Sequence, residues 1–118
     1  MKDQQEGIKE RSYDFALRII KLSKSIPLSR EGNILAKQVM RSGTSIGANV
    51  EEATSAFSKD DFTYKMNTSL KEARETHYWL RLIRDSELLP AKRMTDIIKE
   101  IEEVKNILGA IVRTSKKK

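Results

Sequence analysis

Four stretches of the sequence repeat apolar residues at alternating intervals of three and four, and this periodicity constrains the fold more than any other feature. The spacing gathers apolar side chains on one side of an α-helix, because successive residues are rotated by roughly 100°. We predict helices near residues 8–26, 29–57, 60–87 and 90–114, and no strand. The residues expected to face the core are Ile8, Phe15, Ile19, Leu22 and Ile26; Leu35, Val39, Ile46, Val50, Ala53 and Phe57; Phe62, Met66, Ala73, Leu80 and Ile83; and Met94, Ile97, Ile101, Val104, Leu108 and Ile111.

Residues that interrupt or start helices support these boundaries. Pro27 closes the first stripe, since proline cannot donate the hydrogen bond that continues a helix. Ser58 and Asp61 match a capping box at the start of the third helix. Pro90 suits the first residue of the fourth helix. Four amphipathic helices with short connections predict an all-α, antiparallel up-down-up-down four-helix bundle.

The length and composition exclude several classes of protein. A chain of 118 residues suits one domain, so we predict a single bundle over residues 1–118 that ends in a short basic tail at about 113–118. The absence of cysteine excludes disulfides, thiolate zinc sites and cysteine nucleophiles. No apolar run approaches the ~20 residues that cross a bilayer, and the start of the chain lacks the apolar stretch of a signal peptide. We therefore expect a cytoplasmic protein without a membrane partner.

The net charge of +6 is unevenly distributed along the chain. Beyond Glu103 the sequence holds five basic residues and no acidic one, which leaves a net charge of only +1 for the preceding residues. The five are Lys105, Arg113, Lys116, Lys117 and Lys118. A solvated tail and a phosphate-binding tail both fit this pattern.

Two glycines lie one turn apart inside the second predicted helix. Glycine costs about 1 kcal/mol relative to alanine in a helix interior, so Gly43 and Gly47 need a reason to be there. They lie beside the apolar stripe, where small residues let another helix backbone approach closely. On the other flank, Asn49 and Glu52 can form hydrogen bonds with a neighbour. We therefore predict that this helix packs on more than one side and assign these four residues to a helix-packing or oligomer interface.

The third predicted helix has a second stripe that is rich in aromatic residues. This stripe consists of Tyr64, Tyr78, Trp79 and Leu82, to one side of the core-facing residues. Aromatic residues are enriched in protein–protein interfaces. We therefore expect the stripe to form an oligomer interface; the alternative is that Trp79 only widens the core.

Several basic residues are candidates for binding nucleic acid. In the third predicted helix, Tyr78 lies between basic residues, so that the stripe can contact phosphates and stack on a base. An ordinary solvated face is the alternative, because Glu75 and Asp85 are close in the sequence. The candidates are Lys37 and Arg41 in the second predicted helix, Lys71, Arg74 and Arg81 in the third, and Lys116, Lys117 and Lys118 at the C-terminal end.

The sequence offers little for catalysis. A di-iron site in a four-helix bundle needs two Glu-x-x-His motifs, whereas His77 is the one histidine and follows Arg74, not a glutamate, at that spacing. The two mid-helix glycines match no phosphate-binding loop. His77 is expected at the edge of the core as a structural residue. We predict a protein that is not an enzyme, with no catalytic residue, no metal and no cofactor.

Two segments of the chain resemble a known family. "LAKQVMRSGTSIGANVEEA", followed by "KDDFTYKMNTSLKEARETHYWLRLI", is similar to the four-helix-bundle proteins encoded within 23S ribosomal RNA intervening sequences. The resemblance spans nearly the whole chain and contains no enzymatic motif. The residues that carry it are Gln38, Arg41, Ser42, Ser45, Ile46, Ala48, Asn49, Glu51, Glu52, Glu72, Ala73, Glu75, Thr76, Trp79 and Leu80, together with Phe15, Ala16 and Pro27.

The resemblance implies a bundle that assembles into a ring-like homopentamer. It also implies a relation to the accessory variability protein of diversity-generating retroelements, whose partners are a reverse transcriptase and nucleic acid. The body of this chain is less basic than that of this relative. We predict a non-enzymatic oligomeric accessory protein that associates with RNA or DNA through basic surfaces of a ring-like assembly. A protein-binding scaffold with no nucleic-acid partner is the alternative.

Overall fold

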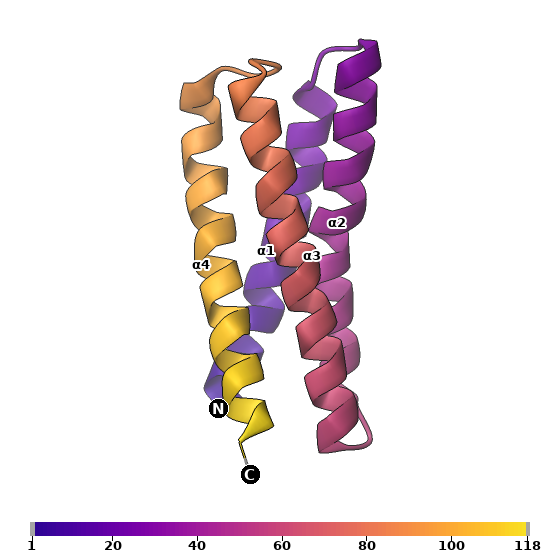
Figure 1. Ribbon diagram of the computed structural model, residues 1–118, viewed down its shortest axis with the longest axis vertical. Helices are drawn as coiled ribbons and strands as arrows, with labels where there is room; N and C mark the ends of the chain where they lie inside the picture. Colours follow the sequence, from indigo (N-terminus) through magenta and orange to yellow (C-terminus); the bar gives the residue numbers. More distant parts are fainter. Residues whose placement is uncertain (1, 118) are drawn as a thin grey trace.

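The computed structural model describes residues 2–117, with side chains described from residue 7 onward. This part folds into four helices, α1 (Lys2–Ser25), α2 (Arg30–Thr54), α3 (Lys59–Asp85) and α4 (Ala91–Lys116). The helices run along the long axis of a molecule of 47 × 21 × 19 Å, and α1 begins at the end of the bundle where α4 finishes (Figure 1). The predicted all-α, up-down-up-down bundle is confirmed, and the described residues contain no strand.

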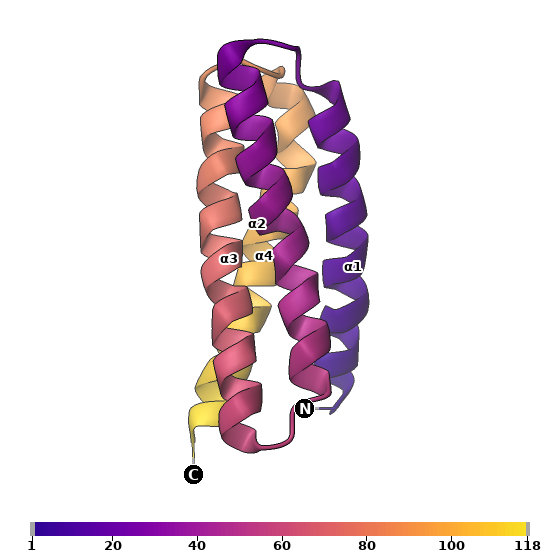
Figure 2. The same cartoon turned by 90° about the vertical axis from the view of Figure 1, so that its right-hand side faces the viewer.

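Each helix packs against two neighbours. α2 contacts α1 and α3, and α4 contacts α3 and α1, so that α1 lies diagonally across from α3 and α2 from α4 (Figure 2). Every contacting pair is antiparallel, since each loop reverses the chain direction. The bundle therefore has four seams, and residues on one seam come from two specific helices.

Serine side chains start two of the helices. The Ser29 hydroxyl accepts a hydrogen bond from the amide of Gly32 (2.9 Å), and the Ser58 hydroxyl accepts one from the amide of Asp61 (3.0 Å). Each bond satisfies an amide that has no carbonyl partner in the first turn. The predicted cap at Ser58 is thus confirmed. Pro90 precedes α4 as its N-cap instead of being its first helical residue.

Two helix boundaries differ from the prediction. α2 ends at Thr54, and Phe57, which was predicted to face the core, lies in the following loop and is fully exposed. The physical reason is that Ser58 takes an extended backbone to cap α3, so the chain must leave the helical conformation before it. At the other end of the chain, α4 continues through Lys116, and most of the expected basic tail is the last turn of this helix.

The apolar stripes fill the core as predicted, with small polar residues between them. Leu35 and Phe62 are only partly buried, whereas Val39, Ile46 and Leu80 are fully buried. Five buried hydroxyl side chains lie within or beside this core. They are Ser12, Ser42, Ser69, Thr76 and Ser115.

Hydroxyl groups link α2 to α3 across their seam. Ser69 Oγ donates to the carbonyl oxygen of Ile46 (2.8 Å), and Thr76 Oγ1 donates to Ser42 Oγ (2.8 Å). A buried polar group without a partner costs more than a hydrogen bond contributes. The Ser69 bond therefore favours the observed register of the two helices, because a shift would take its acceptor away, whereas Thr76 Oγ1 also bonds the carbonyl oxygen of Glu72 in its own helix (2.8 Å).

Candidate nucleic-acid interface

Exposed basic residues border the seam between α3 and α4. Arg74 and Arg81 lie three residues before and four residues after His77, so the three side chains share one side of α3. The His77 ring faces α4, where Lys105 Nζ lies 3.2 Å from its Nδ1 and Glu102 Oε2 lies 3.6 Å from its Nε2. Arg74 and Arg81 are exposed. They therefore project into solvent along this seam.

The acidic residues in the middle of α3 bind cations and donors on the opposite flank. Arg41 of α2 donates hydrogen bonds to Glu72 (3.3 Å) and to Glu75. The indole N–H of Trp79 donates to the same Glu75 carboxylate (3.2 Å). These contacts direct both carboxylates to the seam between α2 and α3, away from α4. Glu75 is therefore bonded to Arg41 and Trp79 and does not pair with the basic residues on the α4 side of α3.

We call Lys71, Arg74 and Arg81 the basic row. Near its upper end Asp85 pairs with Arg84 (2.7 Å), and this hydrogen bond lowers the pKa of the Asp85 carboxyl below its usual range. Within residues 7–117, no member of the basic row has an ion-pair partner. The three positive charges are thus available for an external anion.

An aromatic ring lies within the basic row. The guanidinium of Arg81 stands 5.9 Å from the centre of the Tyr78 ring, within the range of a cation–π contact. Trp79 meets the same ring edge-on, with 5.1 Å between the ring centres. The Tyr78 side chain is 48% exposed. It can therefore offer a face to an unpaired base beside cations that contact the backbone.

The α4 side of the seam carries basic residues together with the carboxylate of Glu102. Arg113 and Lys116 are exposed, and Lys105 donates a hydrogen bond to Nδ1 of His77. Burial, and then the nearby Lys105 ammonium, lower the pKa of His77 below its usual range. The imidazole is consequently neutral at pH 7, so that it accepts the Lys105 bond and adds no charge of its own.

The structure divides the predicted nucleic-acid-binding residues among three regions. The basic row lies on the α3/α4 seam, as just described. Lys37 and Arg41 belong to α2, which does not contact α4, and Arg41 is occupied by α3 carboxylates. Lys116 and Lys117 lie at the end of the bundle, and Lys118 falls outside the described residues.

The sequence analysis did not identify Lys59, a further basic residue at this end of the bundle. Lys59 Nζ donates to the carbonyl oxygen of Lys117 (2.6 Å), which joins the first residue of α3 to the residue that caps α4. Lys59 could have been predicted from the antiparallel arrangement, because this arrangement places the start of the third helix beside the end of the fourth.

The residues predicted for the oligomer interface do not form one surface. Gly43 and Gly47 are buried against α1 of the same chain. Asn49 donates to the carbonyl of Ser45 within α2, and Glu52 pairs with Lys65 of α3 (2.8 Å). The remaining four lie on α3. Of these, Tyr64 and Tyr78 are exposed, and Trp79 and Leu82 are half-buried.

A second exposed apolar surface lies on the outer side of α1 and α2. It surrounds a groove of about 470 Å³. Tyr13 and Leu17 on α1 are 58% and 51% exposed, and Ala48 on α2 is also exposed. The sequence analysis missed this surface, although Tyr13, Leu17 and Ile20 recur at helical spacing beside the main stripe of α1. We call it the α1/α2 groove, lined by Tyr13, Ala16, Leu17, Ile20, Thr44, Gly47, Ala48 and Glu51.

Two further properties concern metals and membranes. The described residues contain no group of three His, Asp or Glu side chains that could hold a metal ion. No helix in the described part of the chain is both long and apolar enough to cross a bilayer.

Comparison with known proteins places this geometry in a family context. The model of the family described as 23S rRNA-intervening sequence protein matches residues 4–110. A solved structure of a protein of unknown function from the S23 ribosomal protein family of Bacteroides thetaiotaomicron VPI-5482 is 38% identical. The match covers 93% of this chain and 98% of that one, with a TM-score of 0.87. No curated protein matches the chain.

Proposed function

The chain belongs to the family of 23S rRNA-intervening sequence proteins, and from this premise we propose that it is a non-enzymatic, oligomeric accessory protein that binds RNA or DNA through the α3/α4 seam. The observation that carries the proposal is the basic row, which has no ion-pair partner within residues 7–117 and lies beside the exposed ring of Tyr78. Cations along one side of a helix with an aromatic ring between them suit a single strand, whose phosphates and unstacked bases are both accessible.

An assembly through the α1/α2 groove would be compatible with the same function. The α1/α2 groove and the α3/α4 seam lie on opposite sides of the bundle, because α1 is diagonal to α3 and α2 to α4. Copies that associate through the α1/α2 groove would leave every basic row exposed. The positive charge of +6 per chain would then be multiplied in one particle. Five subunits is the number that the family resemblance implies.

Binding to labelled single strands of RNA and DNA tests the proposal. Fluorescence anisotropy at increasing salt should show weak sequence selectivity and an affinity that falls steeply, since each neutralised phosphate of a single strand contributes a slope of about −0.7 in log K against log salt. We expect the double variant Arg74→Glu/Arg81→Glu to lose at least about tenfold in affinity and to have a shallower slope.

A matched control distinguishes the effect of the basic row on affinity from the effect of net charge. Lys21→Glu/Lys24→Glu changes the net charge by the same amount, at exposed residues of α1. We expect this control to lose less than about threefold, because only the long-range field changes. Equal losses in the two double variants would show that binding follows net charge and not the basic row.

The protein-binding scaffold is the alternative function. The α1/α2 groove favours it, because contiguous exposed apolar residues often mark a protein-binding site. An intact oligomer that binds neither RNA nor DNA at low salt would favour the scaffold. A reverse transcriptase as partner is an expectation from the resemblance, and co-purification with the reverse transcriptase encoded beside the gene, where there is one, would test it.

A further inference from the structure

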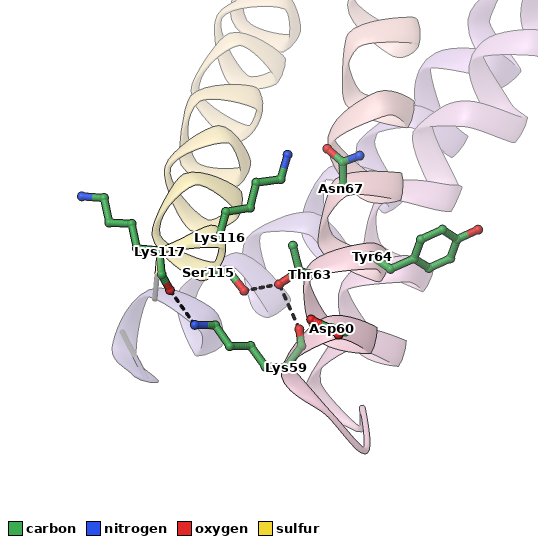
Figure 3. A pocket seen from close by; sticks show the side chains of 8 residues that line it. All are labelled: Lys59, Asp60, Thr63, Tyr64, Asn67, Ser115, Lys116 and Lys117. Atoms are coloured by element: carbon green, nitrogen blue, oxygen red, sulfur yellow. Dashed lines mark hydrogen bonds between the residues drawn. The ribbon is translucent and has the colours of Figure 1, made fainter.

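A pocket of about 540 Å³ lies between the start of α3 and the end of α4 (Figure 3). Lys59 and Thr63 line it from α3, and Ser115, Lys116 and Lys117 line it from α4. It lies at the end of the same seam that carries the basic row. A strand that follows the seam toward this end of the bundle would therefore reach the pocket.

The position of Lys59 is fixed by a hydrogen bond. Its ammonium donates to the carbonyl of Lys117 (2.6 Å), and two of its three N–H groups remain for other acceptors. Behind it, the hydroxyls of Thr63 and Ser115 form a hydrogen bond with each other, and Thr63 Oγ1 also donates to the carbonyl of Lys59 (2.9 Å). Dashed lines mark these contacts in Figure 3. The pocket thus holds one cation in place before any ligand binds.

The charges that line the pocket favour an anion. Lys59 and Lys116 supply two positive charges, and Asp60 supplies one negative charge, whereas the Lys117 side chain extends away from α3 (Figure 3). The C-terminal carbonyls of α4 also oppose an anion through the helix dipole, but the Lys59 ammonium is bonded to one of them, the Lys117 carbonyl. A phosphate can accept hydrogen bonds from the lysine ammonium groups. Asp60 is the one carboxylate among the lining residues.

One uncharged side chain can provide recognition beside the lysines. The Asn67 amide forms no hydrogen bond with other described residues, and it lines the pocket. In Figure 3 the Lys116 side chain extends from α4 toward Asn67, whereas the Tyr64 ring points away from α4. An amide can pair with the polar edge of a base.

From this geometry we infer that the pocket binds a nucleotide, with its phosphate on Lys59 and Lys116 and its base at Asn67. The inference rests on the proposed function, since the nucleotide would be one unit of the strand on the α3/α4 seam. The pocket would then anchor the strand at one end, while the basic row holds the phosphates that follow.

Nuclear magnetic resonance of the full, ¹⁵N-labelled chain tests the pocket directly. We expect uridine 5′-monophosphate to shift the Asn67 side-chain amide and the backbone amides of Thr63 and Lys116 in a saturable way. Uridine, which lacks the phosphate, should leave them in place. Inorganic phosphate should shift the two backbone amides but not the Asn67 side chain. Equal shifts with the nucleotide and with phosphate alone would overturn the assignment of a nucleotide.

Two variants that change the charge of the pocket in opposite directions should change its affinity for the nucleotide in opposite directions. Lys59→Gln should weaken binding of uridine 5′-monophosphate by about fivefold, and Asp60→Asn should strengthen it by a similar factor, because one unit charge at about 4 Å in water corresponds to such a change. Lys24→Gln near the end of α1, at the opposite end of the bundle, is the matched control and should have no effect. The pocket proposal is wrong if Asp60→Asn leaves the affinity unchanged.

The titration with uridine 5′-monophosphate also distinguishes the pocket proposal from the proposal that the basic row binds a strand. Arg74→Glu/Arg81→Glu should weaken binding of a long strand and leave the shifts caused by uridine 5′-monophosphate intact. Loss of strand binding in this variant together with absent nucleotide shifts in the unmodified chain would support the basic row and refute the pocket. Nucleotide shifts in a chain that binds no strand would refute the anchoring role.

Discussion

Gly47 of α2 lies directly against Ser12 of α1: a Cβ atom at Gly47 would stand 3.3 Å from both the carbonyl oxygen and the hydroxyl of Ser12. One turn away, a Cβ at Gly43 would stand 2.8 Å from Cγ1 of Ile19. The same contact explains the gap that Ser12 leaves in the apolar stripe of α1. A small residue on each helix brings the two backbones together, so the glycines serve packing within one chain.

Substitution of Gly47 should show this close approach. Gly47→Leu should lower the free energy of unfolding by ~1–3 kcal/mol through overpacking against the α1 backbone. Gly47→Ala should change it by less than about 1 kcal/mol, because better helix propensity offsets the tight contact. Urea denaturation measures both. Gly7→Ala is the control: no atom lies within 4 Å of its added methyl, so this change should be stabilising. Equal stability of the Gly47→Leu and Gly47→Ala proteins would contradict the packing role.

The ion pair between α1 and α4 should make stability depend on acid. Arg11 donates to Glu100 (2.7 and 2.8 Å) and to Glu103 (2.7 Å), and the bonds from Arg11 lower the pKa of Glu100 below its ordinary value of 4.5. A carboxyl with a lowered folded-state pKa stabilises the protein above its unfolded-state pKa, and this contribution is lost as the pH falls through the folded-state value. Glu100→Gln should therefore cost about 0.5–1 kcal/mol at pH 7 and progressively less below pH 4. Urea midpoints at pH 7 and pH 3 measure the difference, and an equal cost at both would contradict the assignment.

His77 should give a pH dependence in a different range. Because burial and Lys105 lower its folded-state pKa, the unfolded chain binds a proton more readily than the folded chain. Stability should thus be full above the unfolded-state pKa of about 6.5 and fall as the pH drops below it. His77→Gln should flatten the urea midpoint between pH 5.5 and pH 7.5. A steeper dependence in this variant than in the unmodified chain would refute the prediction.

A charge in the α1/α2 groove should disrupt the proposed assembly. Leu17 is 51% exposed within the groove, and Leu28 is 93% exposed in the loop between α1 and α2. Leu17→Asp should shift the mass measured by light scattering from oligomer to monomer, since it places a carboxylate in an apolar contact. Leu28→Asp, the matched control, should leave the mass unchanged. A monomeric unmodified protein at micromolar concentration would refute the assembly itself.

Introducing a carboxylate at Trp79 should weaken the seam between α2 and α3. Its indole N–H donates to Glu75, which also binds Arg41. Trp79→Glu would add a second negative charge beside Glu75 and remove half-buried aromatic surface, and should cost about 2–4 kcal/mol. Trp79→Phe keeps most of the apolar surface and should cost less than about 1.5 kcal/mol. Denaturation of the two variants measures these costs, and light scattering shows whether the assembly changes with them.

The periodicity of the sequence determined the fold, and tertiary structure decided which surface residues can work together. Apolar spacing and the Ser58 cap predicted four helices because both act within a few turns of one helix. Phe57 was misplaced because the cap of the next helix overrides the pattern that precedes it. The basic row could be predicted from its spacing on α3. Its availability could not, because this depends on Arg41 of another helix drawing Glu72 and Glu75 to the opposite flank. The same holds for Lys59, whose neighbour Lys117 is 58 residues away, since charges interact through space and a sequence records only their order along the chain.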